Sequence, residues 1–189
     1  MRPMRGPLGV LAGALAVGGL VAWLALRPSG PPMVIEDLVE ALPSATVQRP
    51  SPDVFRIVDA SLGGQSKRAI QVAGSSRLVY AVTIPDGAAL QVSLGLAEEA
   101  WTVAGEGVLF RILLSAPRET DQRQLLNRTV APGRSPADRG WHDVEIDLSS
   151  YAGQTVELFF NTNAGPQERE ARRGDLALWG EPRIVAPEP

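Results

Sequence analysis

A period of two in the apolar side chains, which begins near residue 54, is the feature that most constrains how this chain folds. Five segments place every second residue on an apolar face, as strands do when one side is buried and the other faces water. These segments are 77–84, 89–96, 108–114, 142–148 and 155–162. Weaker alternation predicts further strands at 54–60, 67–72, 124–130 and 175–185.

Turn-forming residues separate these segments, for example Gly63-Gly64, Pro85-Asp86-Gly87 and Gly153. No run with helical periodicity longer than a single turn follows residue 53. Many short strands joined by frequent turns predict a β-sandwich or a β-barrel. Roughly 135 residues are enough for one core of this kind.

Three stretches resemble the galactose-binding-like jelly-roll domains. They are WHDVEIDLSSYAGQTVELFF at 141–160, DLALWGEPRI at 175–184 and GEGVLFRI at 105–112. The NPCBM-type carbohydrate-binding modules are the named family that this similarity suggests, and similar domains occur in bacterial envelope proteins. The resemblance implies an all-β jelly-roll β-sandwich of about eight to nine strands over residues 54–189. It also implies carbohydrate binding without catalysis, although a fold does not determine the ligand.

Residues 7–26, PLGVLAGALAVGGLVAWLAL, contain no charge. As a helix they would rise about 30 Å, which is the thickness of the bilayer hydrocarbon. Arg2 and Arg5 precede the run and Arg27 closes it, so we expect a signal-anchor transmembrane helix within 1–27. The protein would cross the cytoplasmic membrane once, with its N-terminus inside and its C-terminal domain extracytoplasmic. A cleaved signal peptide is the alternative, but the run is long for one and no small-x-small cleavage site follows it.

Residues 28–53 read as a proline-rich linker, with prolines at 28, 31, 32, 43, 50 and 52. Within it, the segment 33–42, MVIEDLVEAL, has apolar residues at helical spacing. We therefore expect a short amphipathic helix that packs on the following domain or on a partner. A frayed linker helix is an equal alternative, because isolated helices of this length are marginal in water.

The composition excludes several kinds of site. There is no cysteine, which rules out disulfides, thiolate metal ligands and cysteine nucleophiles. The single histidine, His142, excludes a multi-histidine metal site and is the only candidate base for a serine triad. A net charge of −3 gives no basic surface for nucleic acid. We therefore expect neither an enzyme nor a nucleic-acid-binding protein.

The resemblance implies that loops at one end of the sandwich form the recognition surface, here 97–107, 132–141 and 164–174. Trp101 would supply an aromatic platform for a sugar ring, and Arg139 and His142 would supply hydrogen bonds to hydroxyl groups. We expect His142 on the polar face of its strand. The alternative is that Trp101 is partly buried at the end of the sandwich and that Arg139 and His142 are ordinary surface residues.

Other candidate residues are weaker. Trp179, in the middle of a strand, is predicted to lie in the core, whereas the face of Trp141 is ambiguous. Three carboxylates, Asp143, Glu145 and Asp147, alternate along one predicted strand. Glu157 is their expected neighbour on the next strand, and we call the four residues the carboxylate row. Such a row is compatible with a structural calcium ion or with a solvated face paired with arginines. No other cofactor is expected.

Two functions follow from these patterns. The first is a membrane-anchored extracytoplasmic module that binds cell-envelope carbohydrate. The alternative is a structural or assembly protein of an envelope complex that acts through protein–protein contacts. The apolar residues of segment 33–42 favour the second.

Overall fold

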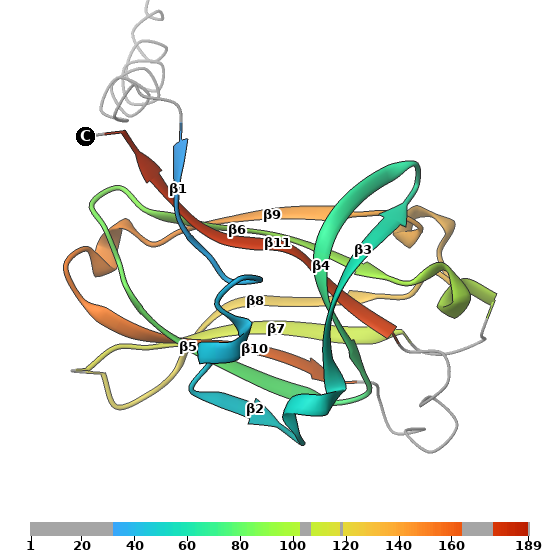
Figure 1. Ribbon diagram of the computed structural model, residues 1–189, viewed down its shortest axis with the longest axis horizontal. Helices are drawn as coiled ribbons and strands as arrows, with labels where there is room; N and C mark the ends of the chain where they lie inside the picture. The colour runs from blue at the N-terminus through green and yellow to red at the C-terminus, as the bar shows by residue number, and fades with distance from the viewer. Residues whose placement is uncertain (1–31, 103–106, 118, 164–175, 189) are drawn as a thin grey trace, which may run out of the picture.

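The computed structural model describes residues 32–102, 107–117, 119–163 and 176–188, and in these residues the protein is a sandwich of two antiparallel sheets (Figure 1). The first sheet has the order β3 (Phe55–Leu62), β4 (Gln65–Ala73), β11 (Leu176–Pro187), β6 (Ala89–Leu96), β9 (His142–Asp147), with β1 (Pro32–Asp37) also paired to β11. The second has the order β2 (Val47–Arg49), β5 (Ser76–Thr83), β10 (Thr155–Asn163), β7 (Val108–Ser115), β8 (Arg123–Val130). The connections include the 3-10 helices η1 (Leu42–Ser44), η2 (Pro52–Val54), η3 (Glu98–Thr102), η4 (Pro136–Asp138) and η5 (Ser149–Tyr151).

The chain changes sheets at almost every connection from β4 onward. The order β4-β11-β6-β9 faces the order β5-β10-β7-β8, which is the double-sheet connectivity of a jelly roll. The predicted β-sandwich is therefore confirmed, and the weak alternation at 54–60, 67–72, 124–130 and 175–185 corresponds to β3, β4, β8 and β11. The structure adds β1 and β2, so the described residues contain eleven strands rather than eight or nine.

The core lies between the sheets and follows the alternation of the sequence. Phe110, Phe160 and Trp179 meet at its centre, each buried almost completely. The ring of Trp179 stands edge-on to Phe110 and Phe160, with centroids 4.8 and 5.2 Å away. The prediction that Trp179 belongs to the core is confirmed, and Phe110 lies on the buried face of the alternating segment 108–114.

The predicted amphipathic helix over 33–42 is wrong. Residues Pro32–Asp37 form β1, which pairs with Arg183–Pro187 of β11, and the chain then turns into η1. A strand on an existing sheet gains ladder hydrogen bonds, whereas a helix of about ten residues is marginal by itself. The apolar residues therefore separate: Leu38 is buried, while Val34 and Ile35 are 46% and 42% exposed.

The sandwich also begins earlier than residue 54. Both β1 and β2 lie within the expected linker, and each pairs with one of the two sheets. The turn after β1 is fixed to the opposite sheet, because the hydroxyl of Tyr80 donates a hydrogen bond of 2.8 Å to the carbonyl of Leu38. Burial raises the pKa of this Tyr80 hydroxyl.

The apolar run 7–26 and the expected signal-anchor helix lie outside the described residues. Within the described part of the chain, no helix has the length and apolar character needed to cross a bilayer.

Candidate functional site

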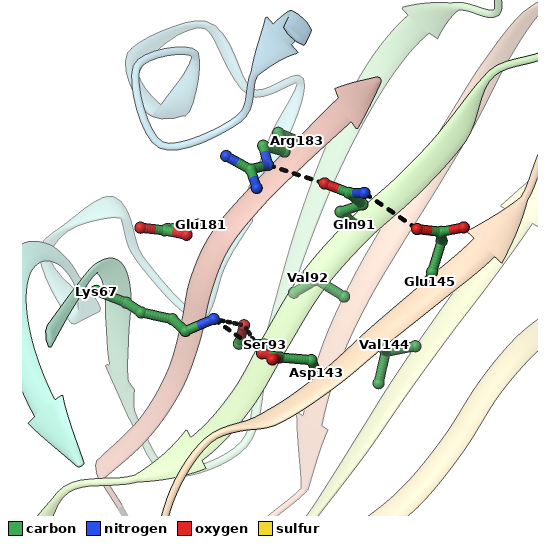
Figure 2. Close-up of a pocket in the computed structure, with 9 residues that line it drawn as sticks. All are labelled: Lys67, Gln91, Val92, Ser93, Asp143, Val144, Glu145, Glu181 and Arg183. Carbon is green, nitrogen blue, oxygen red and sulfur yellow. Dashed lines mark hydrogen bonds and ion pairs between the residues drawn. The ribbon is translucent and has the colours of Figure 1, made fainter. Parts of the chain in front are cut away.

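A polar groove lies on the outer face of the first sheet, across β6, β9 and β11 (Figure 2). Its volume is about 320 Å³, and one side is formed by β4, which contributes Lys67. We call it the sheet groove. It is lined by Lys67, Gln91, Val92, Ser93, Asp143, Val144, Glu145, Glu181 and Arg183.

Lys67, Ser93 and Asp143 form the first polar cluster of the sheet groove. Ser93 and Asp143 face each other across β6 and β9, so both side chains leave the same face. The Lys67 ammonium donates to Ser93 Oγ and to Asp143 Oδ1, each at 2.8 Å, and Ser93 Oγ donates to the same Asp143 Oδ1 at 2.6 Å. Ser93 and Lys67 are largely enclosed, whereas the Asp143 side chain is 72% exposed.

These hydrogen bonds define the charge state of Asp143. Donation from Lys67 and from Ser93, together with the positive charge of Lys67, lowers the pKa of Asp143 below its ordinary value. Both donors meet Oδ1, so Oδ2 has no hydrogen-bond partner within the described residues. The cluster therefore holds an ionised carboxylate with one oxygen available to a ligand.

A second cluster lies beside the first, two residues further along β6 and β9. Arg183 Nε donates to Gln91 Oε1 at 3.1 Å, and Gln91 Nε2 donates to Glu145 Oε2 at 3.0 Å. The chain Arg183–Gln91–Glu145 thus crosses β11, β6 and β9 in order (Figure 2). Among the described residues, the terminal guanidinium nitrogens of Arg183 and the second carboxylate oxygen of Glu145 have no hydrogen-bond partner.

A β-bulge in β11 sets the position of Arg183. Pairing with β6 shifts between Gly180 and Arg183, so the two residues between them lie opposite Val92 alone. Within this bulge Glu181 has φ of 43°, in the left-handed region that non-glycine residues rarely adopt. The bulge brings Arg183 opposite Gln91 and places Glu181 at the wall of the sheet groove.

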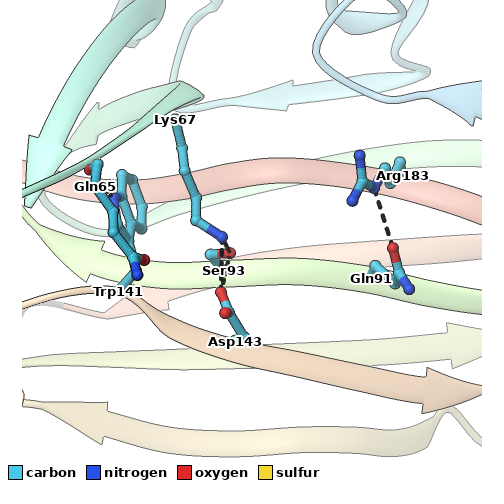
Figure 3. Close-up of polar contacts among 7 residues, drawn as sticks. All are labelled: Gln65, Lys67, Gln91, Ser93, Trp141, Asp143 and Arg183. Atoms are coloured by element: carbon cyan, nitrogen blue, oxygen red, sulfur yellow. Dashed lines mark hydrogen bonds and ion pairs between the residues drawn. The ribbon is translucent and has the colours of Figure 1, made fainter.

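Trp141 lies on the same outer face of the first sheet, next to the Lys67–Ser93–Asp143 cluster (Figure 3). Its indole lies on β6 and β11, where Gly95 and Gly180 leave room for it: a Cβ on Gly180 would come within 2.7 Å of the ring. Its Nε1 donates to the carbonyl of Gln65 at 2.9 Å, next to the start of β4. Figure 3 shows Gln65 and Trp141 beside the Lys67–Ser93–Asp143 cluster. The ambiguity about Trp141 is resolved: it lies on the outer face of the first sheet.

The structure places Trp101 and Arg139 at the end of the first sheet where β6 ends and β9 begins. Trp101 is half-buried in η3, and its Nε1 donates to the carbonyl of Leu96 at 2.9 Å. Arg139 is exposed after η4, and its Nε donates to the carbonyl of Pro132 at 3.2 Å. Each side chain therefore donates a hydrogen bond to a backbone carbonyl of a residue close to it in sequence. That both contact a bound glycan stays a prediction. The expected loop 164–174 and residues 103–106 lie outside the described residues.

His142 is not on the polar face of β9. It has the same parity as Val144 and Ile146, and its side chain is 13% exposed, facing inward. Its Nδ1 lies 2.9 Å from the guanidinium of Arg128 on β8, so this contact joins the edges of the two sheets. Its Nε2 is buried, lies 3.5 Å from Asp138 Oδ1 and forms no hydrogen bond with any described residue. The period of two in β9 places His142 with the core-facing residues, so the expected position on the polar face is wrong.

The carboxylate row is divided between the two faces of the sandwich. Asp143 and Glu145 line the sheet groove, but Glu157 lies on β10 in the other sheet, because β9 and β10 do not pair. Asp143 is bonded to the ammonium of Lys67 and Glu145 to the amide of Gln91, so the partners of these two carboxylates are not the expected arginines. Across the described residues, no group of three histidine or acidic side chains is placed to hold a metal ion.

Most of the sheet groove was not identified from the sequence. The polar faces of 89–96 and 142–148 contain Gln91, Ser93, Asp143 and Glu145, so alternation indicated that these side chains point outward. Nothing local showed that β6 pairs with β9, and the contributions of the weaker strands β4 and β11 depend on that pairing.

The fold and the sheet groove define a jelly-roll sandwich with a polar, open surface site. No protein-family model matches the chain. An uncharacterized protein of Archaeoglobus fulgidus is 36% identical over 104 residues, which are 54% of this chain. The alignment spans a quarter of the length of that relative.

Among solved structures, three similar ones contain carbohydrate-binding modules. A Clostridium perfringens protein with an M60 catalytic domain and CBM51 domains has 10% identity and a TM-score of 0.47, over 86% of this chain and 14% of that one. A CBM51 from a Clostridium perfringens GH95 protein, solved with methyl-galactose, has 14% identity and a TM-score of 0.43, over 85% and 90%. The C-terminal CBM6 of a Zobellia galactanivorans laminarinase has 12% identity and a TM-score of 0.40, over 82% and 99%.

Proposed function

We propose that this protein is a non-catalytic binding module and that the sheet groove holds carbohydrate. The observation that carries the proposal is the pair of polar clusters across β6 and β9. Within the described part of the chain, one presents Asp143 Oδ2 as a free acceptor, and the other presents the terminal nitrogens of Arg183 as free donors. A sugar hydroxyl both donates and accepts, so it is suited to a surface that alternates fixed acceptors and donors.

The resemblance of 105–112, 141–160 and 175–184 to galactose-binding-like modules of the NPCBM type supports the same proposal. Trp101 and Arg139 belong to it as a second contact region at the end of the first sheet, where a larger glycan would extend beyond the sheet groove. His142 would act there only through Arg128, because its own side chain faces inward.

A glycan array probed with the full chain in a non-ionic detergent tests this function. We expect binding to a defined class of neutral sugars, and Asp143→Asn should weaken it about tenfold, because a charge-assisted hydrogen bond is lost. Glu157→Gln, an exposed carboxylate on the other sheet, is the matched control and should bind as the wild type does. An array without any neutral ligand, or equal losses in both variants, would overturn the proposal.

The membrane anchor is part of the proposal and rests on residues 7–26 and their flanking arginines. The module would then lie on the outer side of the cytoplasmic membrane, near envelope carbohydrate. We therefore expect activity from a reporter enzyme that functions only outside the cytoplasm when it is fused after Pro189. Activity of a cytoplasm-dependent reporter at the same position would contradict the topology.

A second candidate function, assembly of an envelope complex through protein contacts, is favoured by β1. This strand pairs with β11 and exposes Met33, Val34 and Ile35 by 45%, 46% and 42%. An exposed apolar edge strand is a typical site of strand addition by another protein. Co-purification of a partner that is lost in Val34→Lys, without any loss of glycan binding, would support this function.

A further inference from the structure

A line of basic side chains crosses the outer face of the second sheet, opposite the face that bears the sheet groove. Strand register places Arg49 of β2 beside Arg77 of β5, Arg77 beside Asn161 of β10, and Asn161 beside Arg111 of β7. Figure 1 shows these four strands side by side. We call Arg49, Arg77 and Arg111, with Asn161 between the last two, the arginine row. At the spacing of neighbouring strands the row is about 14 Å long.

The arginine row lines a cavity of about 310 Å³. None of the described residues that line this cavity is acidic. Like charges on directly opposed residues of neighbouring strands destabilise a sheet, so Arg49 beside Arg77 is unfavourable without an anion. The charge of the row is therefore uncompensated within the described part of the sandwich.

The guanidinium of Arg77 is held by its neighbours, whereas that of Arg111 has a buried nitrogen whose hydrogen-bonding capacity is unused within the described residues. Arg77 Nε donates to Asn161 Oδ1 at 3.0 Å, and the guanidinium lies 5.8 Å from the ring centroid of Phe159. Arg111 Nε is buried and has no hydrogen-bond partner among the described residues. A buried donor without a partner costs free energy that a bound acceptor would recover.

We propose that the arginine row binds the carboxylate or sulfate groups of an acidic glycan. Planar guanidinium groups bind both kinds of oxyanion through paired hydrogen bonds. A straight row suits a linear polymer with acidic groups at intervals, and the Asn161 amide between two arginines suits a neutral hydroxyl. The glycan class rests on the proposed function, but the site is separate from the sheet groove and lies on the other face of the sandwich.

The test measures binding of the full chain, in a non-ionic detergent, to four immobilised polymers. Heparin carries sulfates, polygalacturonate carries carboxylates only, dextran is a neutral glycan, and poly-glutamate is an acidic polypeptide. We expect binding to heparin or polygalacturonate that weakens as salt is raised, and weaker binding to poly-glutamate. The two acidic glycans show which oxyanion is preferred.

Arg111→Gln and Arg49→Gln should each weaken binding to the acidic glycan about tenfold, because each removes one charge-assisted contact. Arg56→Gln, an exposed arginine on β3 of the other sheet, removes the same charge and should change binding less than twofold. Arg111→Gln could weaken binding by destabilising the fold, which a lower melting temperature would reveal. Arg49 is exposed, so Arg49→Gln tests the arginine row without that complication.

Three results would overturn the proposal: no binding of either acidic glycan, an equal loss in Arg56→Gln, or tighter binding to poly-glutamate, which would indicate an acidic protein segment. Asp143→Asn should leave acidic-glycan binding intact, so failure of the sheet groove and failure of the arginine row are distinguishable.

Discussion

Trp141 and Gln65 join two strands that do not pair with each other. The indole of Trp141, immediately before β9, donates to the carbonyl of Gln65, at the start of β4, and the two residues are 76 positions apart in the chain. The hydrogen bond holds the tip of the β3–β4 hairpin to the outer face of the first sheet (Figure 3). Lys67 follows two residues later on β4, so this contact positions one wall of the sheet groove.

Trp141→Phe keeps an aromatic side chain but removes this hydrogen bond together with part of the ring that packs on Gly95 and Gly180. We expect a loss of about 1 kcal/mol in the free energy of unfolding and faster amide hydrogen exchange at the tip of the β3–β4 hairpin. Trp101→Phe removes a similar indole-to-carbonyl bond elsewhere, to Leu96, and is the matched control. Exchange at the hairpin that is unchanged in Trp141→Phe would show that other contacts hold it.

Gly180→Ala should destabilise the protein by about 1–3 kcal/mol in denaturant melts, because the added methyl group would overlap the Trp141 ring. In a Trp141→Ala background the same substitution should be nearly neutral, so the double-mutant cycle should show strong coupling. Additive effects would mean that Trp141 does not rest on Gly180.

Phe110→Ala should cost about 3–5 kcal/mol, because Phe110 is fully buried and packs edge-on against Trp179 at 4.8 Å. Leu109→Ala, on the outer face of the same strand, should cost clearly less. Equal losses in thermal or denaturant melts would contradict the assignment of faces on β7.

Stability should fall in acid partly through Asp143. Its pKa is lowered in the folded protein, so the folded state binds fewer protons than the unfolded state as pH falls toward the folded value. This contribution is complete above the ordinary aspartate pKa of about 4 and is lost as pH falls through the lower folded value. It is small, because Asp143 is exposed.

The measurement is the difference in melting temperature between neutral pH and acid. Asp143→Asn should reduce that difference, because its side chain does not titrate. Glu157→Gln serves as the control on the other sheet. A difference that Asp143→Asn leaves unchanged would contradict the role of the Lys67 and Ser93 hydrogen bonds.

Predictions from the sequence succeeded where the burial of a residue depends only on which face of its strand it occupies, because alternate positions face opposite sides. Phe110 and Trp179 could be assigned to the core because a pleated strand with one buried face requires apolar side chains at every second position. The same rule was misapplied to His142, which alternates with Val144 and therefore faces inward.

Segment 33–42 shows the limit of local pattern. Its apolar spacing is compatible with a helix, but β11 offers it a free edge more than 140 residues later in the chain. Hydrogen bonding to that edge determines the conformation, and no property of the ten residues themselves reports it.

The sequence by itself determined the class of the fold, the faces of the strong strands and the kinds of chemistry that the composition excludes, because these depend on local periodicity and on which side chains are present. Only the tertiary structure decided which strands are neighbours, and hence both candidate sites. Lys67, Ser93 and Asp143 come from three strands, and the arginine row from three others, with Asn161 supplied by β10. Strand pairing depends on contacts distant in sequence, since each hydrogen-bond ladder joins segments whose own residues do not specify a partner.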